Sequence, residues 1–328
     1  MLEPLRIAIV GVGAIGGWIG ARLAARGHRV SALARGTTLQ ALRERGLRLS
    51  SAGKESTAQV VASDDAAALG PQDLVFITVK GPALASVADS VTRLMGAETC
   101  IVSTMNGVPW WFFATSDDAQ GAALQSVDPG GTLLARLPPE HVLGTVVHAA
   151  CTAPEPGHVE HKMGNGLIIG EALGGRSPRL ERAVEVLRDA AFDVTVSERI
   201  QKEIWYKLWG NMTMNPISAF TGATCDRILD DELVAGFVLQ VMAEAAEIGS
   251  RIGCRIDESG TDRMQVTRKL GAFRTSMLQD VDTGRLLEID ALVAAPRELG
   301  RRVGVATPAM DALLGLTRLF ARGRGLYP

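Results

Sequence analysis

The stretch that decides the fold is Arg6-Ile7-Ala8-Ile9-Val10-Gly11-Val12-Gly13-Ala14-Ile15-Gly16-Gly17, in which a short apolar run leads directly into glycines spaced G-x-G-x-x-G. In such a pattern Gly11 permits a tight turn after the strand, Gly13 lets backbone N–H groups approach a pyrophosphate, and Gly16 lets the next helix pack on the strand. The N-terminus of that helix favours phosphate. The stretch therefore predicts a dinucleotide-binding loop made of Gly11, Val12, Gly13, Ala14, Ile15 and Gly16.

The residues after the glycines complete a βαβ unit. Ile15, Ile19 and Leu23 recur at helical spacing, Gly27 ends the predicted helix, and residues 29–34 form a second strand pattern. The alternative is a chance glycine turn between a strand and a helix, because the chain holds 36 glycines. The complete βαβ context favours the dinucleotide site.

The end of the second predicted strand indicates which dinucleotide is bound. An acidic residue there usually accepts hydrogen bonds from the ribose 2′-hydroxyl of NAD. This chain has Arg35 instead, with Arg43 and Arg45 soon after. A guanidinium is a planar fork of donors suited to phosphate, so Arg35 favours NADP, with its 2′-phosphate, over NAD. The alternative is that Arg35 is a solvated surface cation.

Composition limits the possible classes of protein. With 328 residues, 47% hydrophobic and 21% charged, the chain is long enough for two domains with substantial cores. The net charge of −2 and the lack of a basic tract predict no nucleic-acid or anionic membrane partner. No later apolar run reaches the roughly 20 residues that span a bilayer. Four widely spaced cysteines predict neither a zinc cluster nor a disulfide framework, and they indicate a reducing, cytoplasmic compartment.

Strand and helix patterns alternate in the first half of the chain. Residues 74–79 and 100–103 read as buried strands, and a helix is predicted between them over about 82–94. Residues 142–171 read as antiparallel strands joined by a Pro156-Gly157 turn. From about Arg199 onward only helical periodicity remains. The pattern predicts an α/β fold with an N-terminal Rossmann-type doubly wound sheet and a C-terminal all-helical domain.

The predicted domains are an NADP-binding domain over residues 1–198 and a helical substrate and catalytic domain over residues 199–328. Lys80 directly follows the strand pattern at 74–79, and Asn106-Gly107 follows the next strand. Ligands of open α/β sheets bind at such carboxyl ends. Each residue is weak evidence alone, since surface loops are rich in both and Asn-Gly is a turn dipeptide.

A second polar pattern lies in the helical half of the chain. Lys207, Asn211 and Asn215 are spaced by four, so they share one face of a helix whose flanking positions are largely apolar. Asparagine is a poor helix former and needs hydrogen-bond partners when buried. A bound polar ligand would supply those partners. Neighbouring backbone or subunit groups are the open alternative.

Taken together, these motifs resemble the ketopantoate reductase family, that is, 2-dehydropantoate 2-reductase. The resemblance runs through nearly the whole chain and rests on Gly11–Gly16, Val79-Lys80, Asn106-Gly107, Gly144-Thr145 through His148–Ala150, Trp205-x-Lys207-Leu208-x-x-Asn211-x-x-x-Asn215-Pro216, Ser276–Asp280 and Glu288-Ile289-Asp290. It implies an oxidoreductase that uses NADPH to reduce 2-dehydropantoate to (R)-pantoate, in pantothenate and coenzyme A biosynthesis.

The resemblance also implies roles for individual residues. Lys207 corresponds to the general acid, and Glu288 to an acidic residue at the cofactor side of the cleft. An ammonium can stabilise and then protonate the oxygen that becomes negative during hydride transfer, and a carboxylate can orient it and tune its pKa. Without the resemblance, Glu288 would be interpreted as half of a surface ion pair with Arg285. Asn211, Asn215 and Ser276 match substrate contacts, and Lys80, Asn106 and Ala150 match cofactor contacts.

Two departures from the family pattern leave the substrate open. Cys225 stands where a further substrate-contacting asparagine is expected, ten residues after Asn215. The loop after Asn106-Gly107 carries the aromatic run 108–113 and a longer stretch through Gly130, which forms either a core plug or subunit contact, or a wall of the substrate pocket. A reductase of another 2-keto acid would use the same catalytic residues.

A non-catalytic NADP-binding sensor is the alternative from a different class of protein. The joint presence of Lys207, Asn211, Ser276 and Glu288 argues against it. No histidine is assigned a catalytic role, and no metal site is predicted. A homodimer is also possible, through an apolar face formed by Trp205, Trp209 and Phe220.

Overall fold

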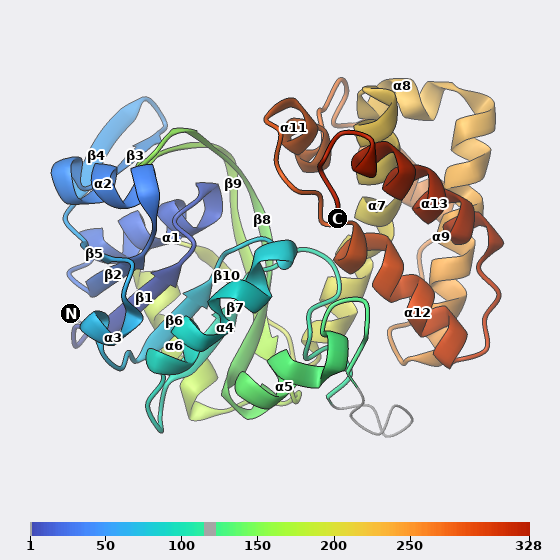
Figure 1. The fold of residues 1–328 in the computed structure, drawn as a ribbon. Helices are drawn as coiled ribbons and strands as arrows, with labels where there is room; N and C mark the ends of the chain where they lie inside the picture. Colours follow the sequence, from blue (N-terminus) through green and yellow to red (C-terminus); the bar gives the residue numbers. More distant parts are fainter. Residues whose placement is uncertain (1, 115–122) are drawn as a thin grey trace. The chain divides into compact units, whose positions relative to one another are not determined.

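The computed structural model describes residues 2–114 and 123–328, which form two compact units (Figure 1). Unit 1 contains Met1–Met105 and Thr132–Ile200, and unit 2 contains Asn106–Gly131 and Gln201–Pro328. The predicted domain boundary at 198/199 lies close to the third crossing between the units, at 200/201. The segment 106–131, which the sequence placed in the first domain, belongs to unit 2. The chain therefore enters unit 2, returns to unit 1, and enters unit 2 again.

Unit 1 is built on one mixed sheet, to which ten strands of the described residues contribute. The strands follow the order β4-β3-β9-β8-β7-β6-β1-β2-β5, and β10 also pairs with β9. Their bounds are β1 Arg6–Val10, β2 Arg29–Leu33, β3 Leu47–Ser51, β4 Lys54–Ala58, β5 Val61–Ser63, β6 Leu74–Ile77, β7 Cys100–Ser103, β8 Val142–Glu155, β9 His158–Glu171 and β10 Asp193–Val196.

Six of these strands form the parallel core of the sheet. Their order, β5-β2-β1-β6-β7-β8, is the doubly wound order of nucleotide-binding domains, which confirms the predicted Rossmann-type fold. The centre is fully buried, as expected for a parallel sheet covered on both faces; Ile7, Phe76 and Val102 are at most 1% exposed. The strand order reverses between β1 and β6. Ligands of such sheets bind at the carboxyl ends of the two strands that flank this point.

Beyond β8 the sheet continues with an antiparallel hairpin, as predicted. β8 and β9 are 14 residues each and run side by side along unit 1 (Figure 1), joined at Pro156-Gly157. Their register begins at Leu143 opposite Glu171 and shifts on either side of Ala150. Strands β3, β4, β5 and β10 were not predicted. They are short, and β4 is a polar strand that is almost entirely exposed.

The helices of unit 1 connect and cover these strands. α1 contacts β1, β2, β3, β8 and β9. Gly17 and Gly20 allow that close packing, because a Cβ at Gly17 would lie 2.5 Å from Val159 and one at Gly20 3.0 Å from Ile9. The helices are α1 Ala14–Ala25, α2 Gly36–Arg45, α3 Ala66–Leu69, η1 Gly81–Ala83, α4 Leu84–Arg93, α5 Thr132–Arg136, η4 Pro139–His141 and α6 Pro178–Asp189.

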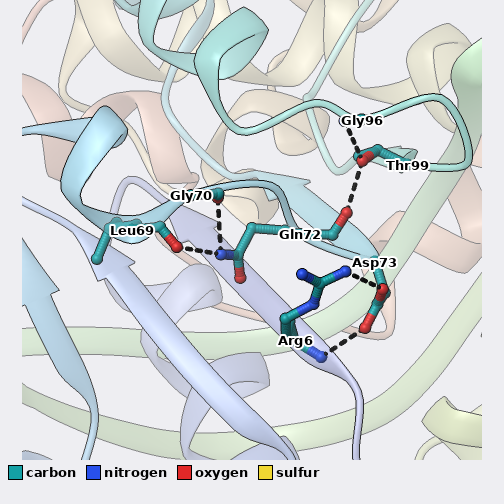
Figure 2. Close-up of polar contacts among 7 residues, drawn as sticks. All are labelled: Arg6, Leu69, Gly70, Gln72, Asp73, Gly96 and Thr99. Atoms are coloured by element: carbon teal, nitrogen blue, oxygen red, sulfur yellow. Dashed lines mark hydrogen bonds and ion pairs between the residues drawn. The ribbon is translucent and has the colours of Figure 1, made fainter.

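A polar network joins the amino-terminal ends of the central strands (Figure 2). Asp73, just before β6, accepts hydrogen bonds from the backbone of Arg6 at 2.8 Å and from its guanidinium at 2.9 Å. Thr99, just before β7, donates to the carbonyl of Gln72 at 2.5 Å and accepts from the Gly96 amide at 2.7 Å. These bonds fix the strand starts at the edge of the sheet opposite to the glycine loop.

Unit 2 is helical, and no strand occurs in its described part, as predicted for the C-terminal half. Its helices are η3 Pro129–Gly131, α7 Ile200–Thr221, α8 Cys225–Asp230, α9 Glu232–Arg251, α10 Gly260–Arg268, α11 Ser276–Asp282, η5 Asp290–Ala294, α12 Ala295–Arg302 and α13 Pro308–Arg322. The indole of Trp205 donates to the Ala245 carbonyl at 3.2 Å, and that of Trp209 donates to the Met242 carbonyl at 2.8 Å, so both fasten α7 to α9. Because Trp205 and Trp209 are at most 2% exposed, they do not form the surface face that the sequence allowed.

Helix α9 is 20 residues long, and its mean hydropathy of 1.4 would allow it to cross a membrane by length and composition alone. Within unit 2 it contacts α8, α10, α12 and α13. Its Glu244 carboxylate accepts hydrogen bonds from the amides of Ala309 and Met310 at 2.8 and 2.9 Å, and so caps the start of α13. The helix is therefore an integral part of the helical unit.

The aromatic run of segment 106–131 fills the core of unit 2. Trp110, Trp111, Phe112 and Phe113 are all at most 8% exposed, and the Phe112 ring lies 6.1 Å from that of Trp205. These contacts are those of a core plug, one of the two alternatives left by the sequence. Residues 115–122 of the same loop lie outside the described residues.

Candidate active site

The glycine loop after β1 gives each of its three glycines a distinct geometric role. Gly11 has a φ of +96°, and a Cβ there would lie 2.8 Å from the backbone nitrogen of Val79. A Cβ at Gly16 would collide with the Gly11 carbonyl oxygen and the Thr78 hydroxyl. That hydroxyl donates to the Gly11 carbonyl at 2.5 Å, which ties the loop to the end of β6. Neither position can accept a side chain without rearrangement.

Gly13 has the opposite environment. It is exposed, and a Cβ built on it would have no atom within 4 Å. Its backbone is extended at the N-cap of α1, where no side chain caps the helix. Open space beside bare backbone at a helix N-terminus is the cradle that a pyrophosphate requires. The loop therefore fits a dinucleotide, with the phosphates at the start of α1.

Two of the predicted cofactor-binding cations lie at carboxyl ends of the central strands. Arg35 is exposed and forms the N-cap of α2, directly after β2 and Ala34. Lys80 is half-buried and precedes η1, three residues after β6 ends. Ala150 lies well inside β8, opposite Met163, where the hairpin register is irregular. β2, β1 and β6 are neighbours, so Arg35, the glycine loop and Lys80 share one edge of the sheet.

In unit 2 a half-buried lysine is the centre of a second group of candidate site residues. Lys207 lies in the middle of α7, and its ammonium donates a hydrogen bond to the side-chain oxygen of Asn106 at 3.1 Å. Asn106 is held by the next residue, Gly107, whose φ is +76° and where a Cβ would lie 2.6 Å from the Ala291 carbonyl carbon. The Val108 amide also donates to the Ala291 carbonyl at 2.9 Å. Asn106, predicted as a cofactor contact, is thus also a partner of Lys207.

Glu288 acts electrostatically on Lys207. Burial lowers the pKa of the lysine from 10.5 to about 8, and the negative charge of Glu288 opposes that fall by favouring the ammonium. Glu288 is half-buried and lies just before η5, a π-helical turn, a feature that is frequent at functional sites. A lysine with a pKa near neutrality is suited to donate a proton.

The remaining predicted site residues have side chains available for a ligand. Asn211 is half-buried and Asn215 is 6% exposed, and neither carboxamide hydrogen-bonds another residue within 2–114 and 123–328. Ser276 is exposed and begins α11, directly after the capping Thr275. Cys225, in place of the expected asparagine, is 2% exposed at the start of α8, and burial raises the pKa of its thiol to about 11. It offers no carboxamide.

Within the described ranges, no group of three or more His, Cys, Asp or Glu side chains could hold a metal ion. The sequence analysis assigned no role to Asp290, or to Tyr327, whose hydroxyl donates to the Asp290 carboxylate. Asp290 belongs to the Glu288-Ile289-Asp290 motif, whereas nothing in the sequence distinguished Tyr327.

A doubly wound sheet with a glycine loop at its switch point, and a helical unit with a half-buried lysine beside an amide and a carboxylate, define a nicotinamide-dependent oxidoreductase. The chain belongs to the ketopantoate reductase family: the family model "Ketopantoate reductase PanE/ApbA" matches residues 7–174, and "Ketopantoate reductase PanE/ApbA C terminal" matches residues 199–321.

Two relatives match the whole chain. A 2-dehydropantoate 2-reductase of Mesorhizobium japonicum is 42% identical over 325 residues, which cover 98% of this chain and all of that protein. A crystal structure from Ralstonia solanacearum, described as that of a candidate ketopantoate reductase, is 56% identical, with a TM-score of 0.96 over 99% of this chain and 100% of that one. The family consists of NADP-dependent oxidoreductases that act on CH–OH groups.

The same fold occurs in a D-mandelate dehydrogenase solved with NADH and anilino(oxo)acetate. That structure has a TM-score of 0.80 at 20% identity and covers 98% of this chain and 99% of that one. At this identity the likeness shows the fold alone.

Proposed function

We propose that this protein reduces 2-dehydropantoate to (R)-pantoate with NADPH, with Lys207 as the general acid. The observation that carries the proposal is the environment of Lys207, which is half-buried, bonded to Asn106 and opposed in charge by Glu288. The family supplies the reaction class, since its members reduce ketopantoate to pantoate. The substrate is the one named for the relative that is 42% identical, a 2-dehydropantoate 2-reductase.

When bound, the nicotinamide supplies a hydride to the carbonyl carbon of the keto acid. Hydride addition leaves negative charge on the carbonyl oxygen, and the Lys207 ammonium stabilises that charge and donates the proton that makes the hydroxyl. Asn106 holds the ammonium through its side-chain oxygen. Glu288 keeps the lysine protonated over a wider pH range than burial alone would allow.

The substrate itself is held by neutral donors and acceptors in this proposal. Asn211 and Asn215 lie one and two helical turns after Lys207 on α7, and Ser276 adds a hydroxyl. Carboxamides and a hydroxyl can bind the carboxylate and hydroxyl of a keto acid without introducing a competing base. Their lack of protein partners in the described residues supports this role.

For the cofactor, we assign the pyrophosphate to the loop Gly11–Gly16 and the 2′-phosphate to Arg35. Lys80 and Asn106 complete the proposed contacts, together with Ala150 and Glu288. The exposed guanidinium of Arg35 at the end of β2 supports NADPH over NADH. Arg35→Ala should weaken NADPH binding about tenfold or more and leave NADH binding nearly unchanged, because only NADPH carries the phosphate. Equal losses for both cofactors would contradict the assignment.

Steady-state oxidation of NADPH tests the proposed reaction. The purified protein should consume NADPH with 2-dehydropantoate, and Lys207→Ala should lower kcat by at least about a hundredfold, the usual range for a general acid. Lys202→Ala, an exposed lysine on the same helix, is the matched control. A protein that leaves NADPH untouched with 2-dehydropantoate and with a panel of other 2-keto acids would disprove the enzymatic function.

A second candidate substrate, another 2-keto acid, is favoured by Cys225. The buried thiol replaces a carboxamide and offers a less polar wall. Comparing kcat/KM for 2-dehydropantoate with that for 2-keto acids with larger apolar side chains distinguishes the two. Cys225→Asn should shift the ratio toward 2-dehydropantoate if the thiol sets the preference.

A homodimer and a cytoplasmic location complete the proposal. Unit 2 has an open apolar groove of about 420 Å³ lined by Phe220, Leu316, Leu319 and Phe320, and Leu319 is 73% exposed. All four cysteines are free thiols, which suits a reducing compartment. Light scattering should give twice the 34.7 kDa chain mass, and Leu319→Glu should halve it. A monomeric wild type would refute the dimer.

A further inference from the structure

The chain segment that carries Glu288 is held on both sides by the residues after α13. On one side, the amide of Leu287 donates to the carbonyl of Leu326 at 3.0 Å. On the other, the hydroxyl of Tyr327 donates to the carboxylate of Asp290 at 2.6 Å. The first contact is made by the residue directly before Glu288, and the second by the residue two positions after it. Residues 323–328, here called the tail, therefore bracket the acidic residue of the candidate site.

The tail is itself fixed to α13. The Leu326 amide donates to the carbonyl of Ala321 at 2.8 Å, and the Leu326 side chain is 5% exposed. The guanidinium groups of Arg318 and Arg322 lie 5.6 and 5.4 Å from the centre of the Tyr327 ring. Arg318 also donates to the same Asp290 oxygen as Tyr327, at 3.4 Å. A rigid helix, a buried leucine and two cations thus hold the tyrosine in place.

The bracketed segment needs this support because helical hydrogen bonds do not fix it. Residues 285–288 lie in neither a helix nor a strand, between the end of α11 and the start of η5. The turn before them contains Gly284, which has a φ of +66°. Glu288 contributes its carbonyl to the next turn, accepting from the Leu292 amide at 3.2 Å. Glu288 is thus the last residue of the irregular stretch 285–288.

We infer that Tyr327 is a positioning residue for Glu288, and that the tail keeps the carboxylate at the place where its charge acts on Lys207. This inference rests on the proposed function only for its kinetic readout. Charged groups near the segment are Lys207 on α7, Arg318 and Arg322 on α13, Arg285 on the segment itself and Asp290 at the start of η5. Burial and the bond to Asp290 raise the pKa of Tyr327, so its hydroxyl remains a donor throughout an assay at pH 6 to 9.5.

Tyr327→Phe tests the inference, because it keeps the ring between the two guanidinium groups and removes only the bond to Asp290. A less firmly held Glu288 should lower kcat by about threefold to tenfold, since small misplacements of a site group are costly. It should also move the basic limb of the pH profile of kcat/KM down by about half a unit, because Lys207 then loses part of the nearby opposite charge. A purely structural role would lower the profile at all pH values without moving the limb.

The chain offers a matched control, because its only other tyrosine has the same kind of bond. Tyr206 donates to the Glu258 carboxylate at 2.6 Å and has the Arg263 guanidinium 5.2 Å from its ring. Tyr206→Phe should leave the basic limb where it is. Asp290→Asn, which can still accept from Tyr327, should retain the limb position, whereas Asp290→Ala should move it as Tyr327→Phe does.

Each outcome of this set has one interpretation. If the wild type turns over, and Tyr327→Phe and Asp290→Ala keep its kcat and the position of its basic limb, the positioning role is refuted. The proposed function is then left intact. A limb that moves equally in Tyr206→Phe also refutes the positioning role. A wild type that fails with every 2-keto acid refutes the proposed function instead. Thermal unfolding of each variant shows whether a loss of activity comes from loss of folding.

Discussion

Lys207→Met should make the protein more stable at neutral pH while it removes activity. The shift of the Lys207 pKa from 10.5 to about 8 corresponds to about 3.5 kcal/mol of net cost for keeping a desolvated ammonium, at about 1.4 kcal/mol per unit. Methionine has a similar length and no charge, so it removes that cost. It also removes the hydrogen bond to Asn106, worth about 1 kcal/mol. The net gain in the free energy of unfolding is about 2.5 kcal/mol at pH 7.

The gain should depend on pH in a defined window. Below the folded pKa of about 8, both the folded and the unfolded protein carry the charged lysine, and the folded state bears the whole cost. Between about 8 and 10.5 the folded protein loses the proton first, so wild-type stability rises with pH relative to the variant. Above 10.5 the lysine is neutral in both states, and the advantage of methionine disappears.

Urea unfolding of the cofactor-free protein, followed at pH 7, 9 and 10.5, measures this difference. Lys202→Met is the matched control, because this lysine is exposed on the same helix and its replacement should change stability by less than about 0.5 kcal/mol. A destabilised Lys207→Met at pH 7, or a difference from wild type that does not change with pH, would refute the view that Lys207 is held charged at a cost.

Three further predictions concern Glu288, Gly16 and Asn215. Glu288→Gln removes the charge that raises the Lys207 pKa, so the basic limb of the pH–kcat/KM profile should move below about 8; a limb that stays or rises would contradict this. Gly16→Ala should raise the Kd for NADPH, measured by fluorescence titration, by at least about tenfold because its Cβ collides with the loop, whereas Gly236→Ala, with open space in α9, should not. Asn215→Ala should lower kcat/KM about tenfold to a hundredfold, at about 1.5–3 kcal/mol per bond to a charged group, without changing the Kd for NADPH.

The parallel core was predictable because its strands are apolar runs followed by glycines or polar residues at their carboxyl ends. Strands such as Lys54–Ala58 were not, because that strand is polar and exposed, and only its pairing with β3 makes it a strand. The two halves of the β8–β9 hairpin were predictable from the Pro156-Gly157 turn between them. Local periodicity therefore recovered the elements that the core buries and missed those that pairing alone creates.

For the site, residue types were predictable and their environments were not. The spacing of Lys207 and Asn211 indicated a shared helix face, but the bond from Lys207 to Asn106 joins residues 101 positions apart. The lowered pKa of Lys207 depends on burial by tertiary packing, which no local pattern encodes. The proposed role of Tyr327 could not be predicted from the sequence either, because it depends on Asp290, Arg318 and Arg322, which only the fold brings beside the tyrosine.

The division of unit 2 into two segments of chain has a consequence for how the protein is made. Trp110, Trp111, Phe112 and Phe113 leave the ribosome about 90 residues before Trp205, which lies against one of them in the finished core. Until α7 is synthesised, these four aromatic side chains have no complete core to enter, and they are exposed to aggregation. A fragment that begins at residue 199, at the boundary that the sequence predicted, would lack the four rings that fill its interior. The C-terminal half of the chain is then not expected to fold when expressed alone, and expression of the whole chain should depend on chaperones that shield the nascent aromatic segment.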